Sequence, residues 1–221
     1  MRTPRLAFLS PLFVLSDEQA MARVREADDE RAFAQLVRRW EGPIQRLCAR
    51  MLGDPHRGED LGQEVFARVF ARRRDYQPSG RFSTWLWRIA VNLCYDELRR
   101  RRRRAEASLD DETEPASEGT ADWVAPDPAP DEALAAREEA EQVRQAMLQL
   151  PEVYRSVLVL RHYEDLKFRE IAEVLELPEG TVKSRMAEAM TQLSRHLRPP
   201  GRRPGVMAAP PAPRNPECRI L

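Results

Sequence analysis

The stretch Y-Q-P-S-G-R-F-S-T-W-L-W-R-I-A-V-N-L-C-Y-D-E-L-R-R-R-R-R-R, residues 76–104, decides the fold of this chain. Within it Leu86, Ile89, Leu93 and Leu98 recur at roughly helical spacing, which predicts a helix with one apolar face. From position 84 to position 104 such a helix is about 30 Å long at the usual rise per residue.

The predicted helix has different chemistry at its two ends. Gly80 breaks the chain before it, and Ser83 or Thr84 is expected to cap its first turn. At the other end are six consecutive arginines from Arg99. Six adjacent like charges repel one another unless an anion lies against them.

Aromatic residues precede these arginines. A basic strip beside exposed rings suits a single-stranded nucleic acid, because guanidinium groups meet phosphates and unstacked bases meet ring faces. We therefore interpret the stretch as a surface for melted DNA, although Trp85 alone is explained equally well as a core residue.

The overall charge of this 221-residue chain is zero, but the charge is strongly segregated. Residues 31–104 hold 18 arginines and 8 acidic residues, whereas residues 105–141 hold one arginine and 13 acidic residues. A neutral total is therefore no argument against nucleic acid, and the distribution favours it.

No cofactor or metal site is expected. The three cysteines include no C-x-x-C pair, and the three histidines have no ligand spacing. Cys48 and Cys94 lie on apolar helical stripes and are expected in the core.

Residues 1–25 are expected to be a partly disordered extension. Their apolar run weakly resembles a signal peptide, but Pro11 interrupts it and it is too short to span a bilayer, so no membrane insertion is expected. Met21 is a candidate for the true start of translation.

Two further amphipathic helices precede the aromatic and arginine-rich one. Asp28 or Asp29 can cap the first, and Gly53 ends it. Its apolar face consists of Phe33, Leu36, Trp40, Ile44, Leu47 and Met51. The second carries apolar residues on one side and Asp60, Gln63 and Glu64 on another. No run has strand periodicity, so residues 26–104 are predicted to form a small all-α domain, a bundle of three to four helices.

Residues 105–138 are predicted to be a flexible linker because they are acidic, contain several prolines and lack apolar periodicity. A solvated tether is one interpretation. The sharper one is that this acidic segment either folds back on the basic helical domain or occupies another basic surface. In the free protein we expect it to shield the strip at residues 99–104. The Pro- and Arg-rich tail, residues 199–221, is expected to be disordered.

Residues 139–198 are predicted to form a second helical domain of four helices. Its sequence from Lys167 onward indicates a helix, a tight turn at residues 177–180 and a second helix. Such a helix-turn-helix places the start of its second helix in a DNA major groove. The spacing alone is of moderate specificity, since many helical hairpins match it.

Taken together, the chain resembles an extracytoplasmic-function (ECF) sigma factor, a small specificity subunit of bacterial RNA polymerase in the sigma-70 family. The resemblance rests on D-L-G-Q-E-V-F (60–66), F-S-T-W-L-W-R-I-A-V-N (82–92) with the following arginines, L-P-E-V-Y-R (150–155), and E-I-A-E-V-L with P-E-G-T-V-K-S-R (170–185). Each motif is weak alone, but the four in this order and spacing are highly specific.

The resemblance implies a role for each matched position. The residues implied to dock on the clamp helices of core RNA polymerase are Asp60, Gln63, Glu64 and Phe66. Those implied to contact the minus-ten promoter DNA are Tyr76, Ser83, Thr84, Trp85, Trp87, Arg88, Asn92, Arg99, Arg100, Arg101 and Arg102, with Tyr76 beside a flipped base. Those implied to read the minus-thirty-five duplex are Arg161, Thr181, Lys183, Ser184 and Arg185. An anti-sigma partner and a cytoplasmic location are also implied.

One departure from the family concerns the recognition helix. Family members often carry arginine at the positions of Glu188 and Met190. A carboxylate there either weakens phosphate contact or accepts a hydrogen bond from a cytosine amino group.

Two other classes of protein were considered. A stand-alone helix-turn-helix regulator would need a dimerisation surface, and the motif at 60–66 would then have no role. A nuclease would need clustered carboxylates or histidines for a metal, and the only candidates are Asp60, Glu64, Asp96 and Glu97. The sequence favours the sigma factor over both.

Overall fold

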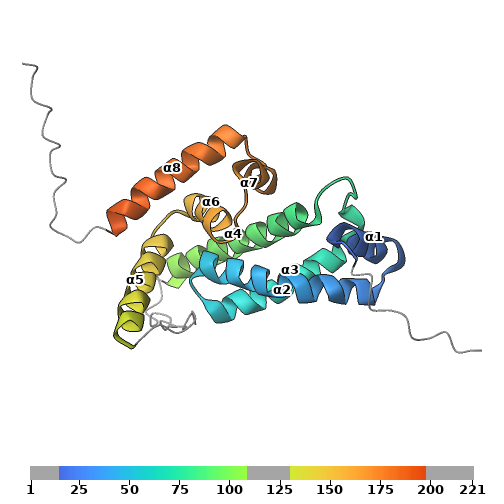
Figure 1. Cartoon of the computed structure of the whole chain (residues 1–221), viewed down its shortest axis with the longest axis horizontal. Helices are drawn as coiled ribbons and strands as arrows, with labels where there is room; N and C mark the ends of the chain where they lie inside the picture. Colours follow the sequence, from blue (N-terminus) through green and yellow to red (C-terminus); the bar gives the residue numbers. More distant parts are fainter. Residues whose placement is uncertain (1–14, 109–129, 198–221) are drawn as a thin grey trace, which may run out of the picture.

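The computed structural model describes residues 15–108 and 130–197, and these residues form helices and connecting turns without strands. The elements are α1 (Asp17–Ala27), α2 (Glu30–Leu52), α3 (Pro55–Ala71), the short 3₁₀ helix η1 (Arg73–Asp75), α4 (Phe82–Ser108), α5 (Pro130–Leu148), α6 (Glu152–His162), α7 (Phe168–Leu175) and α8 (Glu179–His196). Figure 1 shows α1 to α4 packed as one bundle, with α6 and α7 lying against it and α8 beyond them. The all-α prediction is confirmed.

Helix α1 corrects the expectation that residues 1–25 lie outside the first domain. Its Ala20, Met21 and Val24 are buried against the bundle. Ser16 and Gln19 form a reciprocal capping box at its start. A start of translation at Met21 would remove this cap. Residues 1–14 lie outside the described part of the chain.

Helices α2 and α3 form as the periodicity predicts. Asp29 caps α2, and Gly53 ends it with a φ of 71°, a left-handed conformation that favours glycine. A Cβ at Gly53 would also lie 2.6 Å from Leu148 of α5. At Gly58 a Cβ would lie 2.7 Å from the Ala49 backbone, so a glycine is needed where α3 crosses α2.

Helix α4 is longer than predicted and begins earlier. It runs for 27 residues, about 40 Å, and starts at Phe82. Ser83 and Thr84 therefore lie inside its first turn, and the prediction that one of them is the cap was wrong. The Phe82 N–H instead donates to the Glu18 carboxylate of α1 at 3.4 Å, an acidic partner that suits a helix N-terminus. Leu86, Ile89, Leu93 and both cysteines are buried as expected.

The linker is shorter than expected, because α4 continues to Ser108 and α5 begins at Pro130. The acidic shielding proposed for this segment falls largely on residues 109–129, outside the described residues. The expected disorder of residues 199–221 also falls outside them.

Helices α7 and α8 form the expected helix-turn-helix. The turn is earlier than predicted: Glu176 ends α7 in a left-handed conformation with a φ of 55°, and Gly180 already lies inside α8. Ile171, Val182, Met186 and Ala189 are buried between these helices and α6.

Arg155 joins the two domains. It is only 7% exposed and donates to the Met147, Leu148 and Leu150 carbonyls at the end of α5 and to the Met51 carbonyl at the end of α2, at 2.5–3.1 Å. A cation is favourable where helices present free carbonyls. Nearby, the hydroxyls of Tyr95 on α4 and Ser156 on α6 share a 2.7 Å hydrogen bond. None of the described helices combines the length and apolarity that crossing a bilayer requires.

Candidate nucleic-acid interface

The aromatic residues at the start of α4 form a buried cluster. Tyr76 packs against Phe82 and Trp85, with ring centroids 6.2 and 5.4 Å away, and Trp87 packs on Trp40 at 5.6 Å. Tyr76 and Trp87 are 2% and 3% exposed. The expectation of exposed stacking rings is therefore wrong for these two residues, because Tyr76 packs between α4 and the loop before it and Trp87 packs between α4 and Trp40 of α2.

Tyr76 has a structural role here. Its hydroxyl donates to the Gly80 carbonyl at 2.9 Å and closes the loop that leads into α4. Burial raises its pKa. Trp85 stays half-buried and is the ring best placed to meet a base, with Ser83 and Thr84 half-buried beside it. Asn92 is exposed farther along α4.

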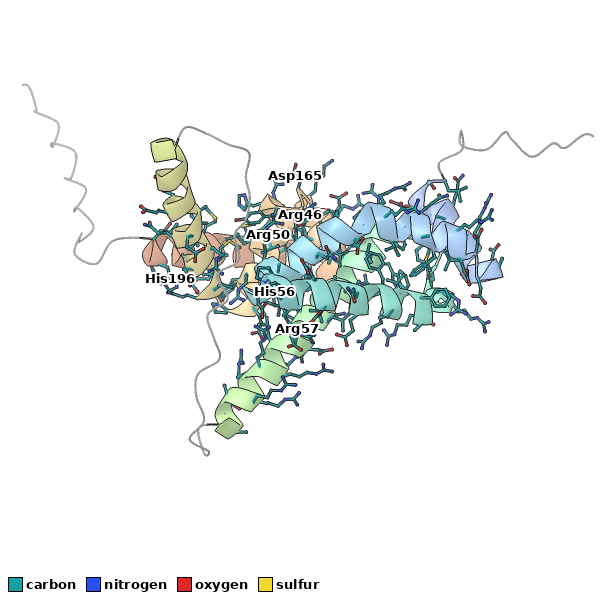
Figure 2. The ribbon with its side chains drawn as sticks, turned by 90° about the horizontal axis from the view of Figure 1, so that it is seen from below. Arg46, Arg50, His56, Arg57, Asp165 and His196 are labelled. Atoms are coloured by element: carbon teal, nitrogen blue, oxygen red, sulfur yellow. The ribbon has the colours of Figure 1, made fainter. Side chains whose placement is uncertain are left out.

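The arginines at the end of α4 do not form a uniform free strip. Arg99 pairs with Asp96 at 3.2 Å, and Arg102 pairs with Glu152 of α6 at 3.0 Å. Arg100 and Arg101 both approach the Glu97 carboxylate, at 3.9 and 3.5 Å. Figure 2 shows this end of α4 projecting away from the other helices.

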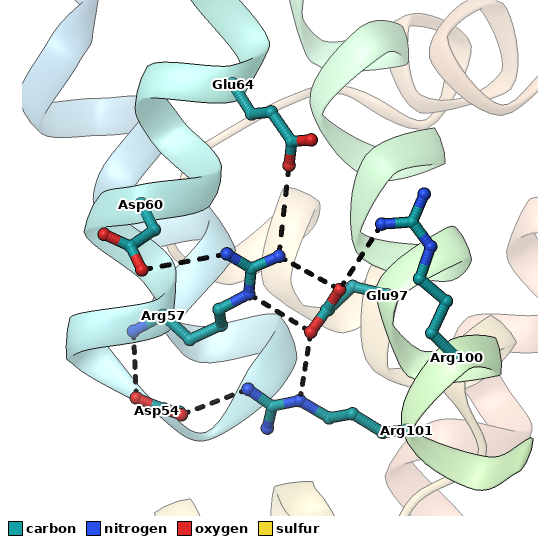
Figure 3. A network of polar contacts seen from close by, with 7 residues as sticks. All are labelled: Asp54, Arg57, Asp60, Glu64, Glu97, Arg100 and Arg101. Carbon is teal, nitrogen blue, oxygen red and sulfur yellow. Dashed lines mark hydrogen bonds and ion pairs between the residues drawn. The ribbon is translucent and has the colours of Figure 1, made fainter. Parts of the chain in front are cut away.

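Glu97 is the centre of a polar network that links α3 to α4 (Figure 3). It is 5% exposed and accepts two hydrogen bonds from Arg57, each 3.1 Å long. Arg57 also lies 3.7 Å from Asp60 and 4.0 Å from Glu64. The network therefore connects the predicted polymerase-docking carboxylates with the predicted strand-binding arginines.

Asp54 completes this network from the start of α3. Its carboxylate caps α3 through the Arg57 N–H and accepts from Arg101 at 3.0 Å. Sequence reasoning missed Arg57 and Asp54, because their partners lie some 40 residues away in the chain. Arg101 was predicted to bind DNA, but its guanidinium group pairs with the carboxylates of Asp54 and Glu97.

Replacing Glu97 with glutamine is expected to lower stability in a pH-dependent way. Hydrogen bonds from Arg57 lower the pKa of Glu97 below its ordinary value of 4.5 in spite of burial. The stabilisation is therefore complete above that value and is lost as the pH falls through the folded-state pKa. At pH 7 the variant should lose about 1–3 kcal/mol of unfolding free energy. The difference should shrink near pH ~3, which lies below the ordinary value of 4.5, because the carboxyl group of the unfolded chain is then already protonated.

Urea unfolding of both proteins at the two pH values measures this difference. Glu26→Gln, an exposed position on α1, is the control. An equal difference at both pH values would contradict the role of the charge.

The docking residues predicted on α3 divide into two groups. Asp60 and Gln63 are exposed and Glu64 is partly exposed, so they form one acidic face on this helix. Phe66 is only 7% exposed and belongs to the core. The prediction that Phe66 lies on the docking surface is corrected, because its side chain packs in the core beneath α3.

The helix-turn-helix presents most of its predicted residues to solvent. Lys183 and Ser184 are exposed at the start of α8, and Thr181 and Arg185 are half-buried. Lys183 pairs with Glu179 at 2.7 Å. Arg161 lies in the preceding α6, 5.7 Å from the centre of the Phe168 ring and 3.7 Å from Asp165.

Glu188 and Met190, where the resemblance led us to expect arginine, also lie on this helix. The Glu188 carboxylate accepts a hydrogen bond from Gln192 at 2.8 Å, and Met190 is exposed. Glu188 is therefore partly engaged within α8.

The carboxylates considered for a nuclease are interleaved with guanidinium groups. Glu97 is held by Arg57, Asp96 pairs with Arg99, and Asp60 and Glu64 lie near Arg57. Figure 2 places two of the histidines apart, His56 at the start of α3 and His196 at the end of α8. In the described part of the chain, no group of three or more acidic, His or Cys side chains could hold a metal.

Family models match both domains. The model for sigma-70 region 2 matches residues 36–104, and the model for sigma-70 region 4 matches residues 140–193. We use these names for the two domains below. Together the fold and the two surfaces define a sigma-type subunit of the transcription apparatus.

Comparison with similar proteins identifies the subfamily to which this chain belongs. The ECF RNA polymerase sigma factor SigW of Bacillus subtilis is 37% identical over 184 residues, covering 82% of this chain and 96% of the relative. The RNA polymerase sigma-H factor of Pseudomonas aeruginosa is 35% identical over 184 residues, covering 83% and 94%. This chain belongs to the ECF subfamily of sigma-70 RNA polymerase sigma factors. It directs RNA polymerase to promoters and is not itself an enzyme, so the alternative of a stand-alone regulator is set aside.

Solved structures show the same fold. CnrH in complex with the cytosolic domain of CnrY matches with a TM-score of 0.58 and 25% identity over 82% of this chain and 96% of that chain. RpoE in complex with the anti-sigma factor NepR from Bartonella quintana has the same TM-score at 19% identity, over 75% of this chain and 96% of that chain.

Proposed function

We propose that this sigma factor docks on core RNA polymerase through the acidic face of α3 and holds the opened minus-ten strand along α4. The observation that supports this most is the position of Asp60, Gln63 and Glu64. They lie on α3 beside the arginine-rich helix, and Asp60 and Glu64 are linked to it through Arg57. Docking and strand binding then use adjoining surfaces of one bundle.

Strand binding on α4 is assigned to residues that can reach a nucleic acid. Arg88, Arg99, Arg100 and Arg102 supply guanidinium groups for phosphates, and Trp85 supplies a ring. Flipping a base costs a few kcal/mol, and stacking it on an aromatic ring returns about 1–3 kcal/mol. One ring therefore cannot open a promoter alone, and the polymerase must supply the rest.

Region 4 is proposed to read the minus-thirty-five duplex. Lys183 and Ser184 lie exposed in the first turns of α8, where a recognition helix meets base edges and phosphates. Thr181, Arg185 and Arg161 are proposed to contribute beside them. Glu188 is proposed to favour cytosine through its carboxylate.

The chain is also proposed to bind an anti-sigma factor and to act in the cytoplasm, where polymerase and DNA are. Support for the first partner comes from a solved relative, since RpoE of Bartonella quintana was captured with the anti-sigma factor NepR.

Transcription in vitro tests the proposed function. Core polymerase, with and without the purified chain, is given a library of random promoter sequences, and the transcripts are sequenced. We expect the chain to enrich templates that share two elements at a fixed separation upstream of the start. If templates transcribed with and without the chain are the same, the proposed function is wrong.

A further inference from the structure

Region 4 covers the side of α4 that carries Arg88, together with Arg81, the residue directly before the helix. These arginines are seven residues apart and so lie on one side of the helix, two turns from each other. Arg81 contacts the Glu170 carboxylate at 2.5 Å, and Arg88 contacts the Glu176 carboxylate at 2.8 Å. Arg88 also donates to the Glu173 carbonyl at 2.7 Å. Every one of these acceptors belongs to α7 or its C-cap.

The acceptors form an acidic edge on α7. Glu170, Glu173 and Glu176 follow one another at intervals of three residues, which places them along one side of a short helix. Glu170 and Glu176 reach α4 with their carboxylates and Glu173 with its backbone carbonyl, whereas the Glu173 carboxylate pairs with Arg169 at 3.4 Å. Two carboxylates and a carbonyl resemble a phosphate backbone in their hydrogen-bond acceptors and carry part of its charge. Farther along α4, Arg102 is paired in the same way with Glu152 of α6.

The ion pairs between these two arginines and α7 are weak enough for another anion to replace them. The Arg81 and Glu176 side chains are 67% and 68% exposed, and ion pairs so open to water are weak and sensitive to salt. The Nε of Arg88 is buried without an acceptor. The acidic edge of α7 therefore leaves one donor of the central arginine unsatisfied.

We propose that this side of α4 is one anion-binding surface with two mutually exclusive occupants. In the free protein the occupant is the acidic edge of α7; in the polymerase complex it is the phosphate backbone of the opened strand. The inference rests on the proposed function for its second occupant. Its consequence is that the free sigma factor binds single-stranded DNA poorly until regions 2 and 4 separate.

Other contacts hold the closed arrangement in place. Arg155 and the Tyr95–Ser156 hydrogen bond lie beyond α7 along the bundle and join α6 to region 2. Burial raises the pKa of Tyr95, while Ser156 and the nearby charge of Arg185 oppose that shift.

The test replaces the carboxylates of Glu170 and Glu176 with uncharged amides of nearly the same shape. In the double variant Glu170→Gln/Glu176→Gln, glutamine at position 170 can still accept the Lys167 N–H that caps α7. Glu138→Gln/Glu139→Gln, two exposed positions on α5, removes the same charge elsewhere. Binding of a fluorescent 20-nucleotide single strand of mixed sequence is measured at low salt for each full-length protein.

We expect the α7 variant to bind the strand about tenfold more tightly than the wild type and the α5 control to bind like the wild type. Adding Arg88→Ala to the α7 variant should remove most of the gain. In parallel, dyes at Ala67→Cys and Ser194→Cys, with Cys218→Ser, should report a greater separation of the two domains in the α7 variant.

Unchanged affinity in the α7 variant would overturn the proposal, whether or not the dyes separate. An equal gain in the α5 control would overturn it as well, since net charge alone would then explain the effect. Transcription with core polymerase is measured on the same preparations. A chain that gains strand affinity but never supports transcription would contradict the proposed function; only the competition between α7 and a single strand for this side of α4 would then stand.

Discussion

Replacing Asp60 and Glu64 together with lysine is expected to lower the affinity for core RNA polymerase by about 100-fold or more, roughly 2.7 kcal/mol. The reason is that both carboxylates reach solvent on one face of α3, and a docking surface complementary to them would meet like charges instead. Promoter-directed transcription should fall in parallel. Binding of the labelled proteins to purified core polymerase measures the effect.

The fold itself should survive this change. The contacts of Arg57 with these two carboxylates are long and partly exposed, and such pairs contribute at most about 1 kcal/mol. The bidentate pair with Glu97 remains. Glu26→Lys/Glu41→Lys, at exposed positions on α1 and α2, is the matched control. Loss of affinity in the control, or none in the α3 variant, would show that polymerase docks elsewhere.

Replacing Arg155 with alanine is expected to give the largest loss of stability, about 3–5 kcal/mol of unfolding free energy. The guanidinium group satisfies carbonyls at the ends of both α2 and α5, and alanine would leave these acceptors buried without donors. The long side chain also fills the junction between the domains, so its truncation opens a cavity.

Thermal and urea unfolding measure this loss. Arg155→Lys should be intermediate, because one ammonium group cannot reach four carbonyls in the geometry of a planar guanidinium. Arg195→Ala, exposed near the end of α8, is the control. A variant at position 155 as stable as this control would mean that the junction contributes little to stability.

Much of the fold could be predicted from local sequence patterns. The apolar stripe of α2, its cap at Asp29 and its end at Gly53 follow from helical periodicity and from the left-handed conformation that glycine allows. The helix-turn-helix followed in the same way. The capping box at Ser16 and Gln19 was also readable, but the apolar run before it drew the interpretation toward a dispensable extension.

What could not be predicted depends on partners distant in the chain. Whether Tyr76 is exposed or buried depends on how the loop at Gly80 folds onto α4, and periodicity carries no information about that. The distribution of partners among the six arginines likewise depends on Glu97 and on carboxylates from α3 and α6. The covering of Arg81 and Arg88 by α7 is a contact between domains that neither domain's own pattern reveals.

The central claim is that the arginine-bearing side of α4 holds the opened strand once polymerase is docked. Permanganate reactivity of minus-ten thymines tests it most directly, using a promoter selected from the library and holoenzyme made with the wild type, Arg88→Ala or the α1 control Arg23→Ala. We predict reactive thymines with the wild type and the control. With Arg88→Ala we predict at least a tenfold loss of reactivity while polymerase remains on the promoter. Reactivity equal to the wild type with Arg88→Ala would contradict the account.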